Sequence, residues 1–368
     1  PDTLVPSVSA VTKLRFPQGI VCISCVVNHS TGNYNILVGG GDGTLTFINQ
    51  NLRAVADRST KLLGGVTSFV MHPNGQSIMV GTAQCNFYQV SMDFKKINML
   101  LSCHQGEVFQ VCFPAGCSDI VVTSSKEDIR IWNVNAKKEL LRIQVKNLDC
   151  KACSVSPSGG LIVSGWSDGK IRAFLPESGK MKFLIPDAHQ GMCTALALAD
   201  DDNYAPWRII SGGADGRVRI WNITSQHQAM ISSLKEHRGA VNSIKVDKNF
   251  TQAISASADG SCIVWDLARS VRIMAFFEPN VFMDVLYHPD ESQMLTCGTN
   301  HKITYWDAVD GQAIRELDCG DAFLTALDIE PEGEFFISGS DDKLLRVWHY
   351  DEGLPVGIGK GHSGTVNA

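Results

Sequence analysis

The stretch ADGRVRIWN at residues 214–222 decides the fold of this chain, because near copies of it recur along the sequence. It contains an acidic turn, a short strand, and a tryptophan followed by a polar residue. Four further segments end in the same way, namely KEDIRIWN (126–133), ADGSCIVWD (258–266), TNHKITYWD (299–307) and DDKLLRVW (341–348). Five of the seven tryptophans therefore occupy one position of a repeat.

Weaker copies of the repeat place Phe174, Ile48 and Val90 at the tryptophan position. The positions are then 48, 90, 132, 174, 221, 265, 306 and 348, and the steps between them are 42, 42, 42, 47, 44, 41 and 42 residues. A period of about 40 to 45 residues with this ending is typical of WD-type β-propellers, in which each repeat forms one four-stranded blade. We therefore predict an all-β propeller with eight four-stranded repeat units, plus the start of a ninth at GHSGTV (361–366). The repeats alone leave two arrangements open: one eight-bladed ring over 20–360, or a seven-bladed ring with pieces of a neighbour.

A hydroxyl residue stands ten positions before most of the aromatic marks. A buried tryptophan N–H needs an acceptor, and such a hydroxyl on the neighbouring strand can supply it. These residues are Ser164, Ser211, Ser255, Thr296 and Ser338. Two units carry a full set of imidazole, hydroxyl, carboxylate and indole: His189, Ser211, Asp215 and Trp221, then His237, Ser255, Asp259 and Trp265. Because active sites are rarely copied from blade to blade, we interpret both sets as scaffold.

Composition and motifs argue against several other classes of function. The formal net charge of −6 gives no general attraction for nucleic acid, and no apolar run approaches the length of a membrane-spanning helix. The twelve cysteines are spread along the chain, as in a reduced cytosolic protein. Two C-x-x-C pairs, Cys22 with Cys25 and Cys150 with Cys153, lie in strand-like runs, where residues three apart point to opposite faces. We expect no catalytic residues, metal site or cofactor, and no nucleic-acid, membrane or small-molecule partner.

Partner contacts are the remaining candidate chemistry, since a propeller offers loops on two rims. Trp166 replaces a small residue in the turn GWSD (165–168), so we expect it on a rim as an interface anchor, with packing inside the blade as the alternative. The 47-residue step contains the acidic insertion DDDNYAPW (200–207), whose Tyr204 and Trp207 are further candidates beside a simple solvated loop. The last candidates stand at the openings of units: Gln105, Gln190, Arg238, Phe282 and Phe323.

Several segments, taken with the residues that surround the repeat motifs, resemble a ciliary group within the WD-repeat family. They are KKELLRIQVKNLDC (137–150), WSDGKIRAFLPESG (166–179) and NHKITYWDAVDGQAIREL (300–317), and the similarity extends from about Leu37 to the end. The resemblance implies two tandem propellers, with residues 1–101 forming the last blades of the first and 102–368 a second propeller that lacks its final blade. The chain would then be part of a longer protein.

The same resemblance implies a non-enzymatic, structural function. It points to a microtubule inner protein on the luminal wall of axonemal doublet microtubules, near the inner junction, with tubulin and other inner-junction proteins as partners. Because the chain is acidic, binding to acidic tubulin would need complementary patches and shape. The alternative is a cytosolic adaptor that recognises a peptide or protein partner at the propeller rim.

Overall fold

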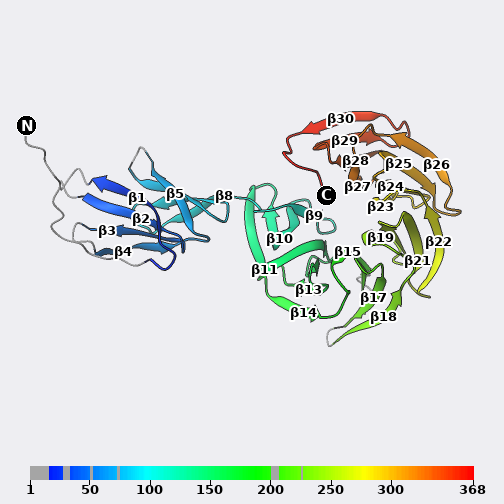
Figure 1. Cartoon of the computed structure of the whole chain (residues 1–368), viewed down its shortest axis with the longest axis horizontal. Helices are drawn as coiled ribbons and strands as arrows, with labels where there is room; N and C mark the ends of the chain where they lie inside the picture. The colour runs from blue at the N-terminus through cyan, green and yellow to red at the C-terminus, as the bar shows by residue number, and fades with distance from the viewer. Residues whose placement is uncertain (1–15, 28–33, 50–52, 73–74, 200–206, 225–226) are drawn as a thin grey trace, which may run out of the picture. The chain divides into compact units, whose positions relative to one another are not determined.

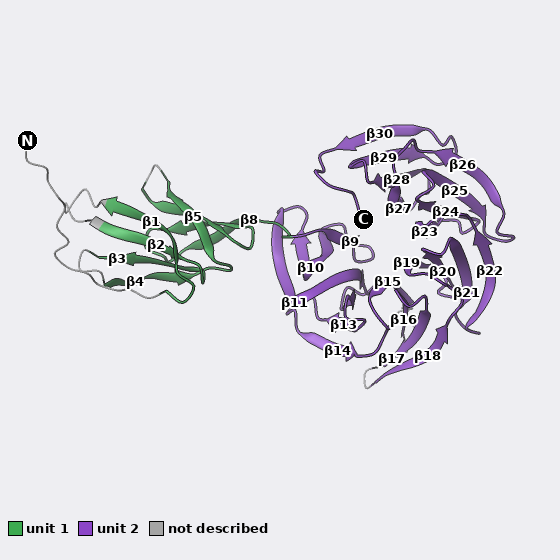
Figure 2. Ribbon diagram, viewed as in Figure 1, with its two compact units in different colours: residues 1–105 green, residues 106–368 purple. Residues whose placement is uncertain are grey.

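The computed structural model describes residues 16–27, 34–49, 53–72, 75–199, 207–224 and 227–368. Within these ranges the regular secondary structure consists of thirty β-strands, so the predicted all-β class is confirmed (Figure 1). No helix in the described ranges is long and apolar enough to cross a membrane. The chain divides into two compact units, residues 1–105 and 106–368 (Figure 2). The boundary between the units lies after Gln105, and the expected division into two tandem propellers stays a prediction.

Unit 1 contains two four-stranded antiparallel sheets in which sequential strands pair. Val66 and Ile78 of one sheet pack against Leu37 and Phe47 of the other in a shared apolar core. The first sheet is β1 (Ile20–Val27), β2 (Tyr34–Gly40), β3 (Thr44–Ile48) and β4 (Ala54–Lys61). The second is β5 (Val66–Met71), β6 (Ser77–Thr82), β7 (Asn86–Ser91) and β8 (Ile97–Ser102).

Unit 2 arranges its sheets around a centre, with the first strand of each sheet innermost and the last outermost (Figure 1). Its first sheet has six strands: β9 (Val108–Cys112), β10 (Ile120–Asn133), β11 (Lys138–Val155), β12 (Ile162–Trp166), β13 (Ile171–Phe174) and β14 (Met181–Ile185). Two four-stranded sheets follow: β15 (Cys193–Ala199), β16 (Trp207–Gly213), β17 (Val218–Ile223) and β18 (Gln228–Leu234), then β19 (Val241–Val246), β20 (Gln252–Ser257), β21 (Ser261–Asp266) and β22 (Val271–Phe277). The last two are β23 (Phe282–Tyr287), β24 (Gln293–Gly298), β25 (Lys302–Asp307) and β26 (Ala313–Asp318), then β27 (Leu324–Ile329), β28 (Phe335–Ser340), β29 (Leu344–His349) and β30 (Pro355–Lys360).

The six-stranded sheet differs from the prediction of separate four-stranded units. Strands β10 and β11 are long, and each covers two strand positions of the repeat. The cause is the turn of the third unit, which has Glu127 at a φ of 65° where four other units have Asp-Gly. Lys126 there pairs with Asp149, and the Asn147 N–H donates a hydrogen bond of 3.0 Å to Glu127 Oε1. These contacts join the third and fourth units into one sheet.

Neighbouring sheets pack face to face through apolar side chains on their inner strands. Gly212 of β16 lies directly against Val241, the first residue of β19, and a Cβ at this glycine would stand 2.6 Å from Val241 Cγ1. Val366 has the same relation to Gly339 of β28, and the Val366 N–H donates to the Ser340 carbonyl at 3.2 Å. The Asn367 side chain donates to the Val108 carbonyl of β9 at 3.1 Å. The expected start of a ninth unit thus lies between the last sheet and the first strand of unit 2.

Candidate functional site

The first predicted network comes together in the sheet β15–β18. His189 Nε2 lies 2.8 Å from Ser211 Oγ, and the same hydroxyl accepts the Trp221 indole N–H at 2.9 Å. His189 Nδ1 lies 3.0 Å from Asp215 Oδ1, and Arg219 donates to the other oxygen of that carboxylate at 2.8 Å. The four residues form one continuous chain of hydrogen bonds.

The second network repeats this geometry in the sheet β19–β22. Ser255 Oγ lies 2.7 Å from His237 Nε2 and accepts the Trp265 indole N–H at 2.8 Å. His237 Nδ1 lies 2.7 Å from Ser261 Oγ and 3.6 Å from Asp259 Oδ2, so a serine hydroxyl stands beside the carboxylate. This serine was not part of the predicted set.

Burial controls the protonation of the first network. It lowers the pKa of His189 to about 4, against the opposing effect of Asp215, so the imidazole is neutral at pH 7. Burial also acts to raise the pKa of Asp215, but hydrogen bonds from His189, Arg219 and the Gln190 N–H outweigh it and lower that pKa to about 2. A nucleophilic serine has to be within reach of its substrate, whereas Ser211 is fully buried. Here the Ser211 hydroxyl and the imidazole are fully engaged with Trp221 and Asp215.

The tryptophan-to-hydroxyl bond recurs in further units. Trp306 donates to Thr296 at 2.8 Å and Trp348 to Ser338 at 2.9 Å, both as the ten-residue spacing predicts. Trp132 donates to Thr123 at 2.8 Å, a contact that the ten-residue rule misses. The spacing there is nine residues, because the turn at Glu127 is one residue shorter than Asp-Gly turns elsewhere.

The expectation that Trp166 lies on a rim is wrong. Its side chain is fully buried, and its indole N–H donates to Ser164 Oγ at 2.9 Å. In four other units the equivalent hydroxyl receives its hydrogen bond from the tryptophan ten residues later, but here that position holds Phe174, which has no N–H. Trp166 therefore supplies the missing donor from within the same strand, and the partner-binding prediction does not hold for it.

The two phenylalanine candidates differ from each other. Phe282 is fully buried and packs edge-on against Phe276, with ring centroids 6.5 Å apart, so its expected partner contact is also wrong. Phe323 is 44% exposed and stacks on His301 with centroids 5.0 Å apart. Phe323 therefore remains a candidate contact.

The polar candidates lie at the surface. Gln105 of unit 1 is exposed, and its side-chain amide donates to the Ala83 carbonyl at 2.9 Å. Gln190 and Arg238 of unit 2 are exposed, and their backbone N–H groups donate to Asp215 and Asp259 respectively. The networks thus fix the backbone of these two residues and leave their side chains available.

The acidic insertion is described only at its end. Tyr204 lies outside the described residues. Trp207 begins β16, is half-buried, and lies with its ring centroid 6.2 Å from that of Phe183. Because Phe183 belongs to β14, Trp207 packs between two neighbouring sheets, and its half-buried side chain stays partly accessible.

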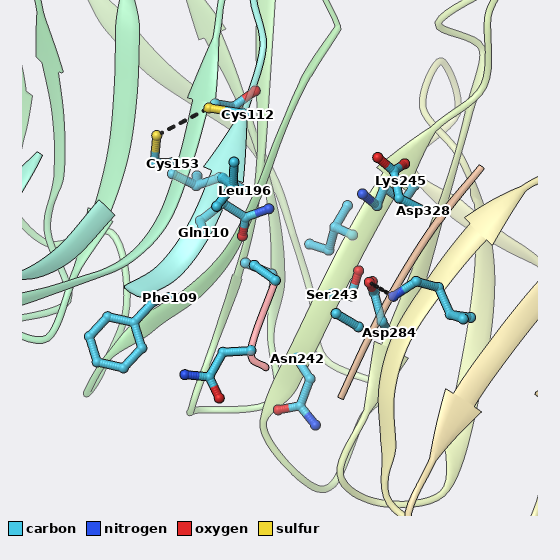
Figure 3. Close-up of a pocket in the computed structure, with 18 of the residues that line it drawn as sticks. Phe109, Gln110, Cys112, Cys153, Leu196, Asn242, Ser243, Lys245, Asp284 and Asp328 are labelled. Carbon is cyan, nitrogen blue, oxygen red and sulfur yellow. Dashed lines mark hydrogen bonds between the residues drawn. The ribbon is translucent and has the colours of Figure 1, made fainter. Parts of the chain in front are cut away.

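Unit 2 encloses a central cavity of about 720 Å³ (Figure 3). Its walls come from the innermost strands, which contribute Phe109, Lys245, Asp284 and Asp328. Asp284 accepts the Leu327 N–H at 3.0 Å, and the Lys151 ammonium stands 3.6 Å from the Phe109 ring centroid. Sequence reasoning missed these residues. For Lys245, Asp284 and Asp328 the available signal was a charged residue in an innermost strand, where most sister units have an uncharged one.

The structure also bears on metal and redox chemistry. Among the described residues, no group of three or more His, Cys, Asp or Glu side chains is placed to hold a metal ion. Cys150 and Cys153 are both buried, and the sulfur closest to Cys153 belongs to Cys112 of β9, at 3.4 Å. The sulfurs that lie close together are therefore those of Cys112 and Cys153, and not those of the C-x-x-C pair Cys150 and Cys153.

Comparison with known proteins agrees with the repeat. The family described as "WD domain, G-beta repeat" matches residues 181–222, 228–266 and 311–349. Cilia- and flagella-associated protein 52 of Sus scrofa is 38% identical over 368 residues, which are 100% of this chain and 58% of that protein. The Homo sapiens protein of that name is 38% identical over 96% of this chain and 56% of its own length, and that of Chlamydomonas reinhardtii is 43% identical over 91% and 54%. The chain thus spans somewhat more than half the length of these relatives. Three stretches of the chain match the WD repeat, and along its length the chain is similar to cilia- and flagella-associated protein 52 of these three organisms.

Proposed function

We propose that this chain acts as a non-enzymatic structural scaffold of motile cilia and flagella. In this proposal it is a microtubule inner protein on the luminal wall of axonemal doublet microtubules, near the inner junction, and it stabilises them during beating. Its partners are tubulin and other inner-junction proteins, and it resides in the axoneme. The observation that carries the proposal is the 38–43% identity, over 91–100% of the chain, to proteins named for association with cilia and flagella.

The outer strands of unit 2 suit contact with several neighbours at once. Each sheet ends in an outermost strand (Figure 1). These strands expose large apolar side chains to solvent. One from each such strand is Met181 of β14, Met230 of β18, Ile273 of β22, Ile314 of β26 and Ile358 of β30, all at least half exposed. Exposed apolar side chains of this kind mark surfaces that bind other proteins. Their distribution around the unit fits a protein held on more than one side.

The arrangement of the polar groups supports a function without catalysis. The two His–Ser–Asp sets are copies of one another, and each uses its serine hydroxyl to accept an indole N–H. Their histidines are buried. Groups used in this way stabilise blades and leave no nucleophile free to attack a substrate.

The proposal is tested by extraction of axonemes. The full-length protein is tagged in a ciliated cell, and demembranated axonemes are washed with rising salt. We expect the protein to stay in the pellet at salt concentrations that remove externally bound complexes, and to leave only when the doublets disassemble. An external protein of the axoneme, followed in the same fractions, serves as the control. Release into the detergent-soluble fraction would refute the scaffold.

The central cavity supports a second candidate function, that of an adaptor for a peptide. It combines charged groups, including Lys245 and Asp328, with the aromatic ring of Phe109. A short peptide should then bind unit 2 at one mouth of the cavity, and Lys245→Ala should weaken that binding. Detergent-soluble behaviour in the extraction experiment would favour this candidate.

A further inference from the structure

Two thiols face each other on the wall of the central cavity. Cys112 is the last residue of β9 and Cys153 lies in β11, so they belong to the innermost strands of the third and fourth repeat units. Their sulfur atoms are 3.4 Å apart, and both residues line the cavity (Figure 3). The two strands hold the sulfurs together, although 41 positions separate them in the sequence.

The two sulfurs differ in access. Cys112 is half-buried and reaches the cavity, whereas the Cys153 side chain is only 3% exposed. The hydrogen bond with Cys112 and burial raise the pKa of Cys153 well above its ordinary value. A cavity of about 720 Å³ admits oxidants of the size of water or hydrogen peroxide. Cys112 is therefore the sulfur that an oxidant meets first.

We infer that Cys112 and Cys153 form a reversible oxidation site, at which a peroxide converts the two thiols into an intramolecular disulfide. In the first step the Cys112 thiolate attacks a peroxide oxygen, the O–O bond breaks, and a sulfenic acid and one water are formed. In the second step the Cys153 sulfur attacks the Cys112 sulfur, the S–O bond breaks, and a second water leaves. Two thiols and one hydrogen peroxide thus give one disulfide and two waters.

Neighbouring cysteines are placed less well for this reaction. Cys150 lies on the same strand as Cys153 but is fully buried, and its thiol donates to the Ala152 carbonyl. The S–S bond length is about 2.05 Å, so the Cys112 and Cys153 sulfurs need to move closer by little more than 1 Å. The disulfide would link β9 covalently to β11, and so restrict movement of these two inner strands relative to each other. This inference is independent of the proposed ciliary function.

The test maps the disulfide in the full chain. The reduced protein is treated with hydrogen peroxide, quenched with catalase, alkylated with N-ethylmaleimide under denaturing conditions, and digested without reductant. Cleavage after Phe109 and Lys126 leaves Cys112 with Cys117 as the only other cysteine, and fragmentation of the linked peptide in the mass spectrometer tells these two apart. Cleavage after Lys151 separates Cys153 from Cys150. We expect mass spectrometry to find the Cys112 peptide linked to the Cys153 peptide, and dithiothreitol to remove this species. The oxidised protein should also melt at a higher temperature than the reduced one.

Two variants and an internal control sharpen the result. Cys112→Ala should abolish the linked peptide, whereas Cys262→Ala, which removes a buried thiol from another sheet, should leave it unchanged. The exposed Cys85 and Cys103 report that the oxidant was active. Alkylation of Cys112 and Cys153 in full, while these exposed cysteines are oxidised, would overturn the inference. Because mapping of the unmodified chain decides the question, it does not depend on the folding of the variants.

Discussion

Replacement of Trp166 by alanine tests whether this ring is part of the core or part of a rim. The ring is fully buried in a cluster with Ile129, Ile162 and Phe174, and it donates to Ser164. Trp166→Ala therefore opens a cavity inside unit 2. If Trp166 were an interface anchor, the same change would leave the stability of the free protein nearly unaltered.

The magnitude of the effect follows from the buried area. A tryptophan side chain buries roughly 200 Å², which at about 25 cal/mol per Å² gives about 5 kcal/mol as an upper estimate. Measured Trp→Ala changes in protein cores cost about 3 to 5 kcal/mol. Ser164 keeps its hydrogen bond to the Arg172 carbonyl at 3.0 Å, so its hydroxyl is not left without a partner. We therefore expect a loss of about 4 kcal/mol, and for Trp166→Phe a loss of about 1 to 2 kcal/mol.

Tryptophan fluorescence in urea measures this loss for unit 2 alone. All seven tryptophans lie between residues 132 and 348, inside unit 2. With a urea dependence of roughly 3 kcal/mol per M, a loss of about 4 kcal/mol lowers the midpoint by about 1.3 M. Phe323→Ala is the matched control, since that ring is 44% exposed and its loss should cost at most about 1 kcal/mol.

The comparison between the two variants decides the matter. A midpoint for Trp166→Ala within 0.2 M or so of that of Phe323→Ala, at equal urea dependence, would refute the assignment of Trp166 to the core. It would also restore this residue as a candidate for partner binding.

Three further predictions concern the hydrogen-bond networks and the turns. Ser211→Ala removes the acceptor of a buried indole N–H and should cost about 2 kcal/mol in urea unfolding, more than Ser211→Thr, which keeps the hydroxyl. Burial lowers the pKa of His189 to about 4, so between about pH 4 and pH 6.5 this imidazole is protonated in the unfolded chain and neutral in the folded chain. The free energy of unfolding should therefore be highest above about pH 6.5 and fall by about 3 kcal/mol as the pH is lowered toward 4. His189→Gln should flatten a plot of unfolding free energy against pH over this range. Gly169 has a φ of 74° and a Cβ there would stand 2.3 Å from a carbonyl oxygen, whereas Gly159 has a φ of 70° and open space. Gly169→Ala should therefore lower the melting temperature several times more than Gly159→Ala.

The period of the tryptophans was enough to predict the class of fold and the scaffold networks. Spacing is informative here because the indole donor and the hydroxyl acceptor lie on adjacent strands, and a hairpin fixes their separation in the sequence. The structure shows the predicted Trp221–Ser211 and Trp265–Ser255 bonds for that reason. The same reasoning failed at Thr123, where a shorter turn changes the separation to nine residues.

The candidate partner contacts were less predictable, because exposure depends on three-dimensional neighbours that no single position reveals. Trp166 was assigned to a rim since sister units have small residues in that turn. Phe174 has no side-chain N–H, so it cannot donate a hydrogen bond to Ser164 Oγ, and the Trp166 indole donates this bond instead. Phe282 is similar: it stands at the opening of a unit, but Phe276 of the preceding outer strand closes over it. In both cases the burial of a side chain depends on a second residue elsewhere in the sequence, so a motif search at one position does not predict it.

The charge of the chain presented an apparent conflict with the proposed scaffold, and the distribution of exposed side chains resolves it. An excess of acidic groups gives no long-range attraction to an acidic lattice, so association by net charge would be slow and sensitive to salt. Side chains such as Ile273 and Ile358 on the outer strands contribute through apolar contact, which salt does not screen. A protein held in this way should resist extraction by salt, whereas one held by charge would leave early. The extraction experiment therefore tests the physical basis of attachment as well as the location of the protein.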